Sequence, residues 1–146
     1  MNLATEPVTG GVDGSYRMGF TVGDHSARHM RRILRMFLVR WDLAVLADGA
    51  ELALTELVVN VVRHVPGRDC VVLILRQPQG LRVEVSDPCP ALSRVARGSG
   101  GDRGEPAEGG RGMLLVEALA DRWGADPNST GKTVWFECDA PGPGGT

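Results

Sequence analysis

The sequence predicts a two-layer α/β sandwich, in which helices pack on one face of a mixed, mostly antiparallel sheet. Three observations support this fold class. Short stretches alternate polar and apolar residues, which indicates strands, and turn residues separate two pairs of them as in hairpins. Two longer stretches repeat apolar residues every three or four positions, which is typical of amphipathic helices. The 146 residues suffice for one domain with its own core.

The first predicted strand covers residues 15–22, where polar and apolar side chains alternate. Gly23 and Asp24 supply a turn and a helix N-cap. The helix that follows extends to about Arg40, because apolar residues recur there at helical spacing. The residues predicted to form its buried stripe are Met30, Ile33, Leu34, Phe37 and Trp41.

The same helix carries a second stripe, which is basic and consists of Arg28, Arg31, Arg32 and Arg35. A solvated face explains such a stripe, and so does a docking surface for an acidic partner protein. Direct contact with nucleic acid is less expected, because no aromatic side chains interleave with the arginines.

A helix predicted over residues 51–65 combines a large apolar surface with a line of polar groups. Because residues three and four apart share a helix face, Glu56, Asn60, Arg63 and His64 lie on one stripe. A carboxylate and an amide oxygen one turn apart suit a metal–phosphate site, although a solvent-facing stripe explains them as well. The residues expected to face the core are Leu52, Leu57, Val58, Val61, Val62 and Val65.

Two hairpins complete the predicted sheet. Pro66 and Gly67 end the preceding helix, and the first hairpin pairs residues 70–75 with residues 81–86. The second hairpin pairs residues 122–125 with residues 132–138.

The segment between the hairpins, residues 87–110, is rich in glycine, proline and charge. A loop of this length inside a compact domain is usually functional. A helix is predicted over residues 112–120, opened by Gly109-Gly-Arg-Gly112. A helix N-terminus exposes unpaired N–H groups that bind phosphate, and Arg111 can add a charged contact. A flexible hinge is the alternative interpretation of these glycines.

Asp87 ends a predicted strand, where its carboxylate can accept the exocyclic amino group of adenine. The alternative is an aspartate that starts a turn before proline. Thr133, at the start of the last strand, places a hydroxyl within reach of the same pocket, and a plain strand-forming residue is the alternative there.

Composition excludes several classes of function. The net charge of −2 gives no general attraction to nucleic acid or to anionic membranes. No apolar run is long enough to span a bilayer, and the N-terminal residues lack the pattern of a signal peptide. The cysteines, Cys70, Cys89 and Cys138, form no metal-ligand pattern, so we expect reduced thiols in a cytoplasmic protein.

Together these motifs resemble a known family. Glu56-Leu-Val-Val-Asn60-Val-Val-Arg-His64 is similar to the N box of the Bergerat-fold ATPases, which include histidine kinases and type II topoisomerase subunits. Val85-Ser-Asp87 resembles their first glycine box, and Gly110-Arg-Gly112-Met-Leu-Leu-Val resembles their second. Gly131-Lys-Thr-Val-Trp135, the small size and the arginine-rich helix resemble the stand-alone anti-sigma-factor serine/threonine kinases and their actinobacterial relatives. The resemblance covers about residues 15–138.

The resemblance implies a role for each motif. Glu56 would be the general base that activates a protein hydroxyl, and Asn60 would ligate a Mg²⁺ ion that bridges the phosphates of ATP. Asp87 would bind adenine with help from Thr133, and a lid over the nucleotide would span about residues 88–109. The further residues implied to contact ATP are Arg63, His64, Gly110, Arg111, Gly112 and Met113.

The family also implies partners and a domain plan. The substrate would be an anti-anti-sigma (STAS) protein, the second partner a sigma factor, and a homodimer is a further expected assembly because relatives often dimerise. The predicted plan is a flexible arm at residues 1–14, the ATPase domain at residues 15–139 and a flexible tail at residues 140–146. Asp87-Pro-Cys-Pro90 departs from the glycines usual after this aspartate. A non-catalytic ATP-binding module that sequesters a partner is therefore the alternative function.

Overall fold

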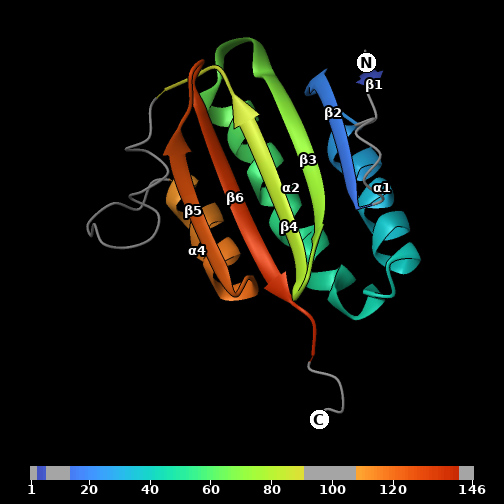
Figure 1. Ribbon diagram of the computed structural model, residues 1–146. Helices are drawn as coiled ribbons and strands as arrows, with labels where there is room; N and C mark the ends of the chain where they lie inside the picture. The colour runs from blue at the N-terminus through green and yellow to red at the C-terminus, as the bar shows by residue number, and fades with distance from the viewer. Residues whose placement is uncertain (1–2, 6–13, 91–107, 142–146) are drawn as a thin grey trace.

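Six strands form one sheet in the computed structural model, which describes residues 3–5, 14–90 and 108–141. The order across the sheet is β1-β2-β3-β4-β6-β5 (Figure 1). The strands are β1 (Leu3–Thr5), β2 (Ser15–Thr21), β3 (Asp69–Gln77), β4 (Gly80–Asp87), β5 (Arg122–Pro127) and β6 (Lys132–Asp139). The short strand β1 falls within the segment that we assigned to an arm.

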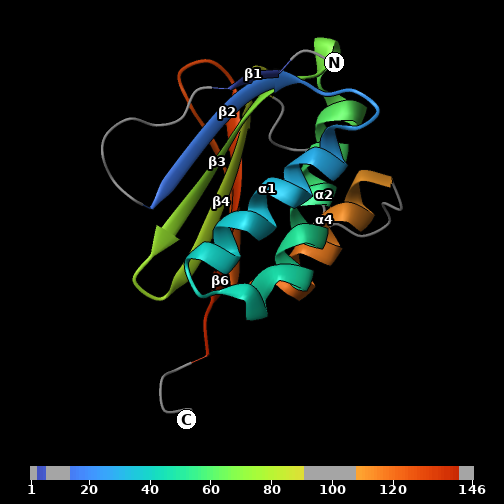
Figure 2. The same ribbon diagram turned by 90° about the vertical axis from the view of Figure 1, so that its right-hand side faces the viewer.

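The helices α1 (Ser26–Arg40), α2 (Ala47–His64) and α4 (Glu108–Leu119) cover one face of the sheet. The view in Figure 2 shows the sheet and the helices as two separate layers. Short 3-10 helices, η1 (Ala44–Leu46) and η2 (Pro66–Arg68), lead into and out of α2. The predicted two-layer α/β sandwich is therefore confirmed.

Every strand pairing in the described sheet is antiparallel, where we expected a mixed sheet. The reason lies in the connections. Two helices, α1 and α2, join β2 to its neighbour β3. The chain runs away from the end of β2 along α1 and comes back along α2, so β3 starts at the end of the sheet where β2 stopped. A single crossover helix would have produced a parallel pair.

The core lies between the sheet and the helices. Alternate residues of the strands point into it, and the largest fully buried side chains come from β2, α1, α2, β3, β4, α4 and β6: Met18, Met30, Leu34, Leu38, Leu54, Leu57, Val58, Val72, Ile74, Leu81, Met113 and Phe136. In α1, Leu38 is fully buried although it was not part of the predicted stripe. Ile33 and Phe37, which we predicted to be buried, are half-buried. Leu52 and Val62, predicted to face the core, are instead 42% and 37% exposed, because they lie on the outer side of α2.

The start of α1 also differs from the prediction. His25 is the N-cap residue, and its side chain makes no capping hydrogen bond. Ser26 accepts a hydrogen bond from the backbone N–H of Gly23 through its hydroxyl oxygen (2.8 Å). Asp24, the predicted cap, is exposed within the preceding turn.

Part of the basic stripe on α1 binds α2. Arg31 donates to the hydroxyl of Thr55 (3.1 Å). Arg35 forms ion pairs with Asp48 (3.0 Å) and with Glu51. These contacts hold the two helices side by side, so half of the predicted stripe is accounted for within the molecule.

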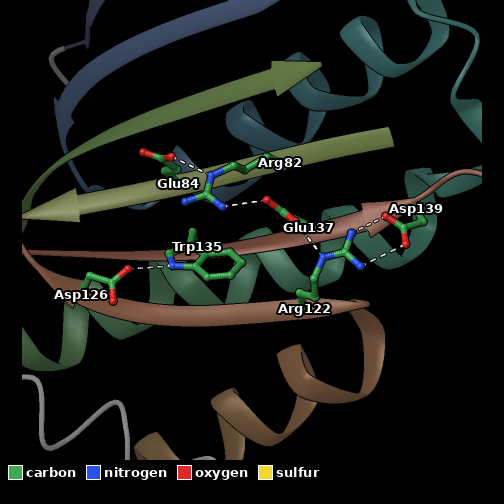
Figure 3. A network of polar contacts seen from close by, with 7 residues as sticks. All are labelled: Arg82, Glu84, Arg122, Asp126, Trp135, Glu137 and Asp139. Carbon is green, nitrogen blue, oxygen red and sulfur yellow. Dashed lines mark hydrogen bonds and ion pairs between the residues drawn. The ribbon is translucent and has the colours of Figure 1, made fainter. Parts of the chain in front are cut away.

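The face of the sheet away from the helices carries a polar network, drawn in Figure 3. Glu137 of β6 accepts hydrogen bonds from Arg82 of β4 and from Arg122 of β5, each at 2.8 Å. The guanidinium of Arg82 lies 4.2 Å from the ring centre of Trp135, and the indole N–H of Trp135 donates to Asp126 (3.1 Å). Three neighbouring strands are thereby linked by side chains on their outer surface.

Candidate functional site

The candidate site lies at the end of the sheet where β4 ends and β6 begins (Figure 1). On the helix side α2 and α4 pack against each other, and Asn60 in the C-terminal half of α2 contacts Met113 in the N-terminal half of α4. Most of the predicted site residues come from these four segments.

Glu56 and Asn60 lie one turn apart on α2, as predicted, and both are half-buried. Asn60 donates its amide N–H to the sulfur of Met113 on α4 (3.2 Å). Because this contact uses the amide nitrogen, the amide oxygen is the atom left for a ligand. Within the described part of the chain, Glu56 has no hydrogen-bond or ion-pair partner. The carboxylate is therefore available for chemistry.

The other predicted residues of α2 lie in its last turn, where Arg63 is exposed and His64 is half-buried. Met113, which we predicted to touch phosphate, is fully buried. Its side chain supports Asn60, so any contact with a phosphate would come from its backbone.

The oxygen donors of α2 suit a hard cation such as Mg²⁺. Magnesium usually takes one or two protein ligands and completes its shell with water and substrate phosphates. Among the described residues, no cluster of three or more His, Cys, Asp or Glu side chains surrounds a common point. A site built on Asn60, with Glu56 nearby, fits a cation that arrives with a nucleotide.

Gly110, Arg111 and Gly112 lie inside α4, which begins at Glu108, four residues before the predicted start. The glycine run thus forms the first turn of the helix. The first four N–H groups of a helix have no partner within it, so Gly110 keeps the property on which the phosphate prediction rests, whereas the N–H groups of Gly112 and Met113 lie beyond these four. Most of the predicted lid, residues 91–107, lies outside the described residues.

Asp87 is buried at the end of β4 and forms an ion pair with Lys132, the first residue of β6. The two side chains are each only 4% exposed. The ammonium nitrogen lies 3.0 Å from both carboxylate oxygens, and it also donates to the backbone carbonyl of Cys89 (3.2 Å). The backbone N–H of Cys89 in turn donates to Asp87 Oδ1 (2.8 Å).

Lys132 is the residue of this site that the sequence did not reveal. It is the chain's single lysine, and it directly follows the turn at residues 128–131, where lysine is usually exposed. The available signal was alternation: Val134 and Phe136 of the same strand face the core, so Lys132 must face it too. Asp87 and Lys132 are directly opposite each other in the strand register.

Thr133, predicted to assist Asp87, points to the opposite face of the sheet. It is paired in register with Ser86, and the two hydroxyl oxygens lie 2.8 Å apart. Thr133 also accepts a hydrogen bond from the amide of Asn128 (2.9 Å). The structure therefore does not bring Thr133 and Asp87 together.

Gly131 allows the two strand ends to come close. A Cβ atom at this position would lie 2.0 Å from the carbonyl oxygen of Asp87 and 2.6 Å from the backbone of Pro88. Such distances exclude any side chain unless the backbone moves. The Asp87-Pro88 turn is thus held against β6 by the glycine contact and by Lys132.

A hollow of about 320 Å³ opens beside this turn, lined by Asp69, Cys70, Val71, Ser86, Asp87, Pro88 and Thr130. Burial, and then the negative charges of Asp87 and Asp69, raise the pKa of the Cys70 thiol to about 12. The thiol is therefore neutral at physiological pH, and the charge at this place comes from the carboxylates. Groups with N–H donors are the natural occupants of such a hollow.

Comparison with known proteins supports the ATPase resemblance. Residues 21–138 match the model of the histidine kinase-like ATPase domain. No curated protein matches the sequence. In the described part of the chain, no helix has the length and apolar character needed to cross a membrane.

Proposed function

The chain belongs to the histidine kinase-like ATPase domain family, and from this premise we propose that it is an ATP- and Mg²⁺-dependent protein serine/threonine kinase. Its substrate would be an anti-anti-sigma (STAS) protein. Phosphorylation of that protein would control the release and capture of a sigma factor by partner switching. The family match supports the ATP-binding, kinase-like part of this proposal, and the remainder rests on the motifs described above.

The observation that carries the proposal is the pair Glu56 and Asn60 on α2. Asn60 is held in place by Met113 and offers an amide oxygen, while Glu56 keeps a carboxylate without a partner among the described residues. Phosphoryl transfer depends mainly on positioning and charge stabilisation, so it needs no covalent intermediate on the protein.

Each residue then has one task in the transfer. Glu56 accepts the proton of the substrate hydroxyl as that oxygen forms its bond to the γ-phosphorus and the bond to ADP breaks. Asn60 supplies an oxygen ligand for Mg²⁺, which neutralises phosphate charge when it is bound. Asp87 receives the adenine amino group, and the first turn of α4 contacts phosphate.

ATP binding is the first test, measured by isothermal titration calorimetry with and without Mg²⁺. We expect binding that depends on Mg²⁺ and that Asn60→Ala weakens. Val62→Ala, an exposed position on the same helix, is the matched control and should bind like the wild type. Absence of binding at millimolar ATP would contradict both the kinase proposal and any other ATP-dependent function.

Phosphoryl transfer is tested separately, with γ-labelled ATP and a STAS protein encoded in the same genome. Glu56→Gln keeps the size of the side chain and removes the base, so it should bind ATP normally and lose transfer about 100-fold or more. Equal transfer by this variant and the wild type would remove Glu56 from the mechanism.

One observation favours the second candidate function, a non-catalytic ATP-binding module that sequesters a partner. The glycines that usually follow the aspartate of the first glycine box are replaced by a proline-containing turn, and that turn is held against β6 by Lys132 and by close packing on Gly131. A turn held in this way lacks the backbone freedom that glycines would give it. ATP binding without any transfer to STAS proteins would favour this module over the kinase.

A further inference from the structure

Strand β5 lies at the end of the sheet, and one of its two edges is unpaired. β6 is its neighbour on one side, and among the described residues no strand lies on the other side (Figure 1). The opposite end of the sheet is formed by β1, which has only three residues. An unpaired strand edge presents backbone N–H and C=O groups that can pair with another chain. What β5 presents at this edge determines which chain can pair with it.

The backbone of β5 presents its free groups at alternate residues. Just after β5, Asn128 donates its N–H to the carbonyl of Gly131 (3.0 Å) and continues the register of β5 with β6. In an antiparallel ladder, every second residue directs both of its backbone groups at the partner strand. The even-numbered residues of β5 share the phase of Asn128, so Trp123 and Ala125 direct their N–H and C=O groups at the free edge. Pro127 has the same phase, and proline is tolerated at an edge because it has no N–H to leave unpaired.

This edge is complementary to itself in an antiparallel pairing centred on Gly124. In that register Trp123 lies opposite Ala125 of a second copy, and Ala125 lies opposite its Trp123. These are hydrogen-bonded pairs, in which facing residues exchange both N–H and C=O contacts. A register centred on Ala125 would instead place Trp123 opposite Pro127, which has no N–H to donate.

On the outer face of the sheet, the same register brings opposite charges together. Arg122 lies opposite Asp126 of the second copy, in the non-hydrogen-bonded type of pair, where side chains are closest. Asp126 is exposed and accepts the indole N–H of Trp135 through Oδ2, which leaves Oδ1 for a further donor (Figure 3). Arg122 donates from each of its nitrogens to Glu137 and Asp139, and a guanidinium has N–H groups beyond these.

On the face toward the helices, the register sets a large apolar side chain against a small one. Trp123 and Ala125 are both half-buried and pack against the core. The indole of one copy therefore faces the methyl group of the other, and two bulky side chains never compete for one place. At the centre Gly124 faces Gly124, so the backbones meet without side chains between them.

We propose that β5 is the docking edge for a second copy of this chain, and that the two copies join into one continuous sheet by antiparallel pairing centred on Gly124. An unrelated strand can satisfy the free backbone groups, whereas a second β5 also supplies an aspartate for Arg122 and an arginine for Asp126. The helices of both copies then cover the same face. Because the two β5 strands run in opposite directions, the two candidate sites lie at opposite ends of the joined sheet, and each is built from one copy.

Analytical ultracentrifugation of the full chain at increasing concentrations tests the pairing. We expect the wild type to form a dimer. Asp126→Arg sets arginine against arginine at both ends of the pairing and should raise the dissociation constant of the dimer about tenfold or more. Asp24→Arg makes the same charge change in the exposed turn before α1, so it is the matched control and should leave the dimer unchanged.

A charge exchange tests the register. Arg122→Asp should also weaken the dimer, because aspartate then faces aspartate. When the Asp126→Arg and Arg122→Asp variants are mixed in equal amounts, every facing pair is opposite in charge, so a heterodimer should form about as tightly as the wild-type dimer. A substitution that merely damages β5 would not be rescued in this way.

The backbone pairing is tested by Ala125→Pro, which removes an N–H that faces the free edge and leaves the ladder with β6 in place. This variant should lose the dimer and keep the circular dichroism spectrum of the wild type, since proline is tolerated on edge strands. If it fails to fold, the charge exchange still decides the outcome.

Three results would overturn the inference. One is a wild type that stays monomeric at every concentration, and another is a dimer that neither Asp126→Arg nor Ala125→Pro weakens, because the interface would then lie elsewhere. The third is loss of the dimer in both charge variants without recovery in the mixture, which would exclude this register. These measurements need no ATP, so the proposed function and this inference can fail separately.

Discussion

Asn60 of α2 donates its amide N–H to the sulfur of Met113 on α4, 3.2 Å away. One residue comes from the N box and the other from the second glycine box, and 53 positions separate them in the chain. The contact joins the two motifs. Because it uses the amide nitrogen of Asn60, it leaves the amide oxygen to face a ligand.

Met113→Leu removes this contact while conserving the volume of the buried side chain. Such a substitution usually costs less than about 1.5 kcal/mol of stability. A hydrogen bond contributes about 0.5–1.5 kcal/mol, so ATP affinity should fall about two- to tenfold as the amide becomes free to rotate. Val116→Ala, at a fully buried position of the same helix, should lower the melting temperature and leave the affinity of the folded protein unchanged. Unaltered affinity in Met113→Leu would show that the contact does not orient Asn60.

Gly131→Ala should destabilise the fold by about 1–3 kcal/mol, because the new Cβ would overlap the backbone of Asp87 and Pro88. Chemical denaturation measures the change. Gly49→Ala on α2 is the contrasting variant, since its Cβ would make an ordinary contact with Leu119 at 3.7 Å. Alanine suits a helix better than glycine by about 0.5–1 kcal/mol, so Gly49→Ala should stabilise the protein. Equal effects of the two substitutions would contradict the close approach at Gly131.

Alkylation by iodoacetamide at pH 8 should modify Cys89 well before Cys70 and Cys138. Burial is the main cause that raises the pKa of Cys70 to about 12 and that of Cys138 to about 11. The thiolate is the reactive form, so the two buried thiols stay protonated and protected at this pH, whereas Cys89 is half-buried. Mass spectrometry identifies the modified residue. Cys89→Ser should show almost no fast labelling, and unfolded protein should be labelled at all three positions.

Glu137 should contribute to loss of stability in acid. Hydrogen bonds from Arg122 and then Arg82 lower its pKa below the usual range. A lowered pKa in the folded state stabilises the fold above the unfolded value of about 4.3, and this stabilisation is lost as the pH falls through the folded value. Glu137→Gln should therefore be less stable than the wild type at pH 7 and show a flatter decline between about pH 5 and pH 3.

Denaturation midpoints across this range measure the effect of Glu137. Glu117→Gln, an exposed position on α4, is the control and should follow the wild-type curve. Parallel curves for Glu137→Gln and the wild type would mean that the network of Arg82 and Arg122 does not stabilise the carboxylate.

Local patterns predicted most of the fold. Alternation located most of the strands, including β4, in which Val83 and Val85 face the core, and helical spacing located α1 and α2. The α2 pattern failed at Leu52 and Val62 because a helix with apolar residues on most sides does not reveal which side meets the sheet. Only the packing of α2 on its neighbours decides that.

The site was predicted less completely, because its geometry depends on strand register. Asp87 lies opposite Lys132 in the pairing of β4 with β6, and a shift of one residue would place Thr133 there instead. The two strands lie 45 positions apart, and no local pattern fixes their register. The sequence thus located Asp87 correctly at a strand end but did not identify the residue that faces it.

The position of β6 affects how the protein forms during synthesis. β6 lies between β4 and β5 although it follows both in the chain. On the ribosome, β2, β3 and β4 can pair in the order in which they emerge, but β5 finds no neighbour until residues 132–139 have left the exit tunnel. Until then the edge of β4 is unpaired, and such edges invite aggregation or binding by chaperones. Asp87 gains its ammonium partner only at that moment, so the candidate site is among the last parts of the molecule to be assembled.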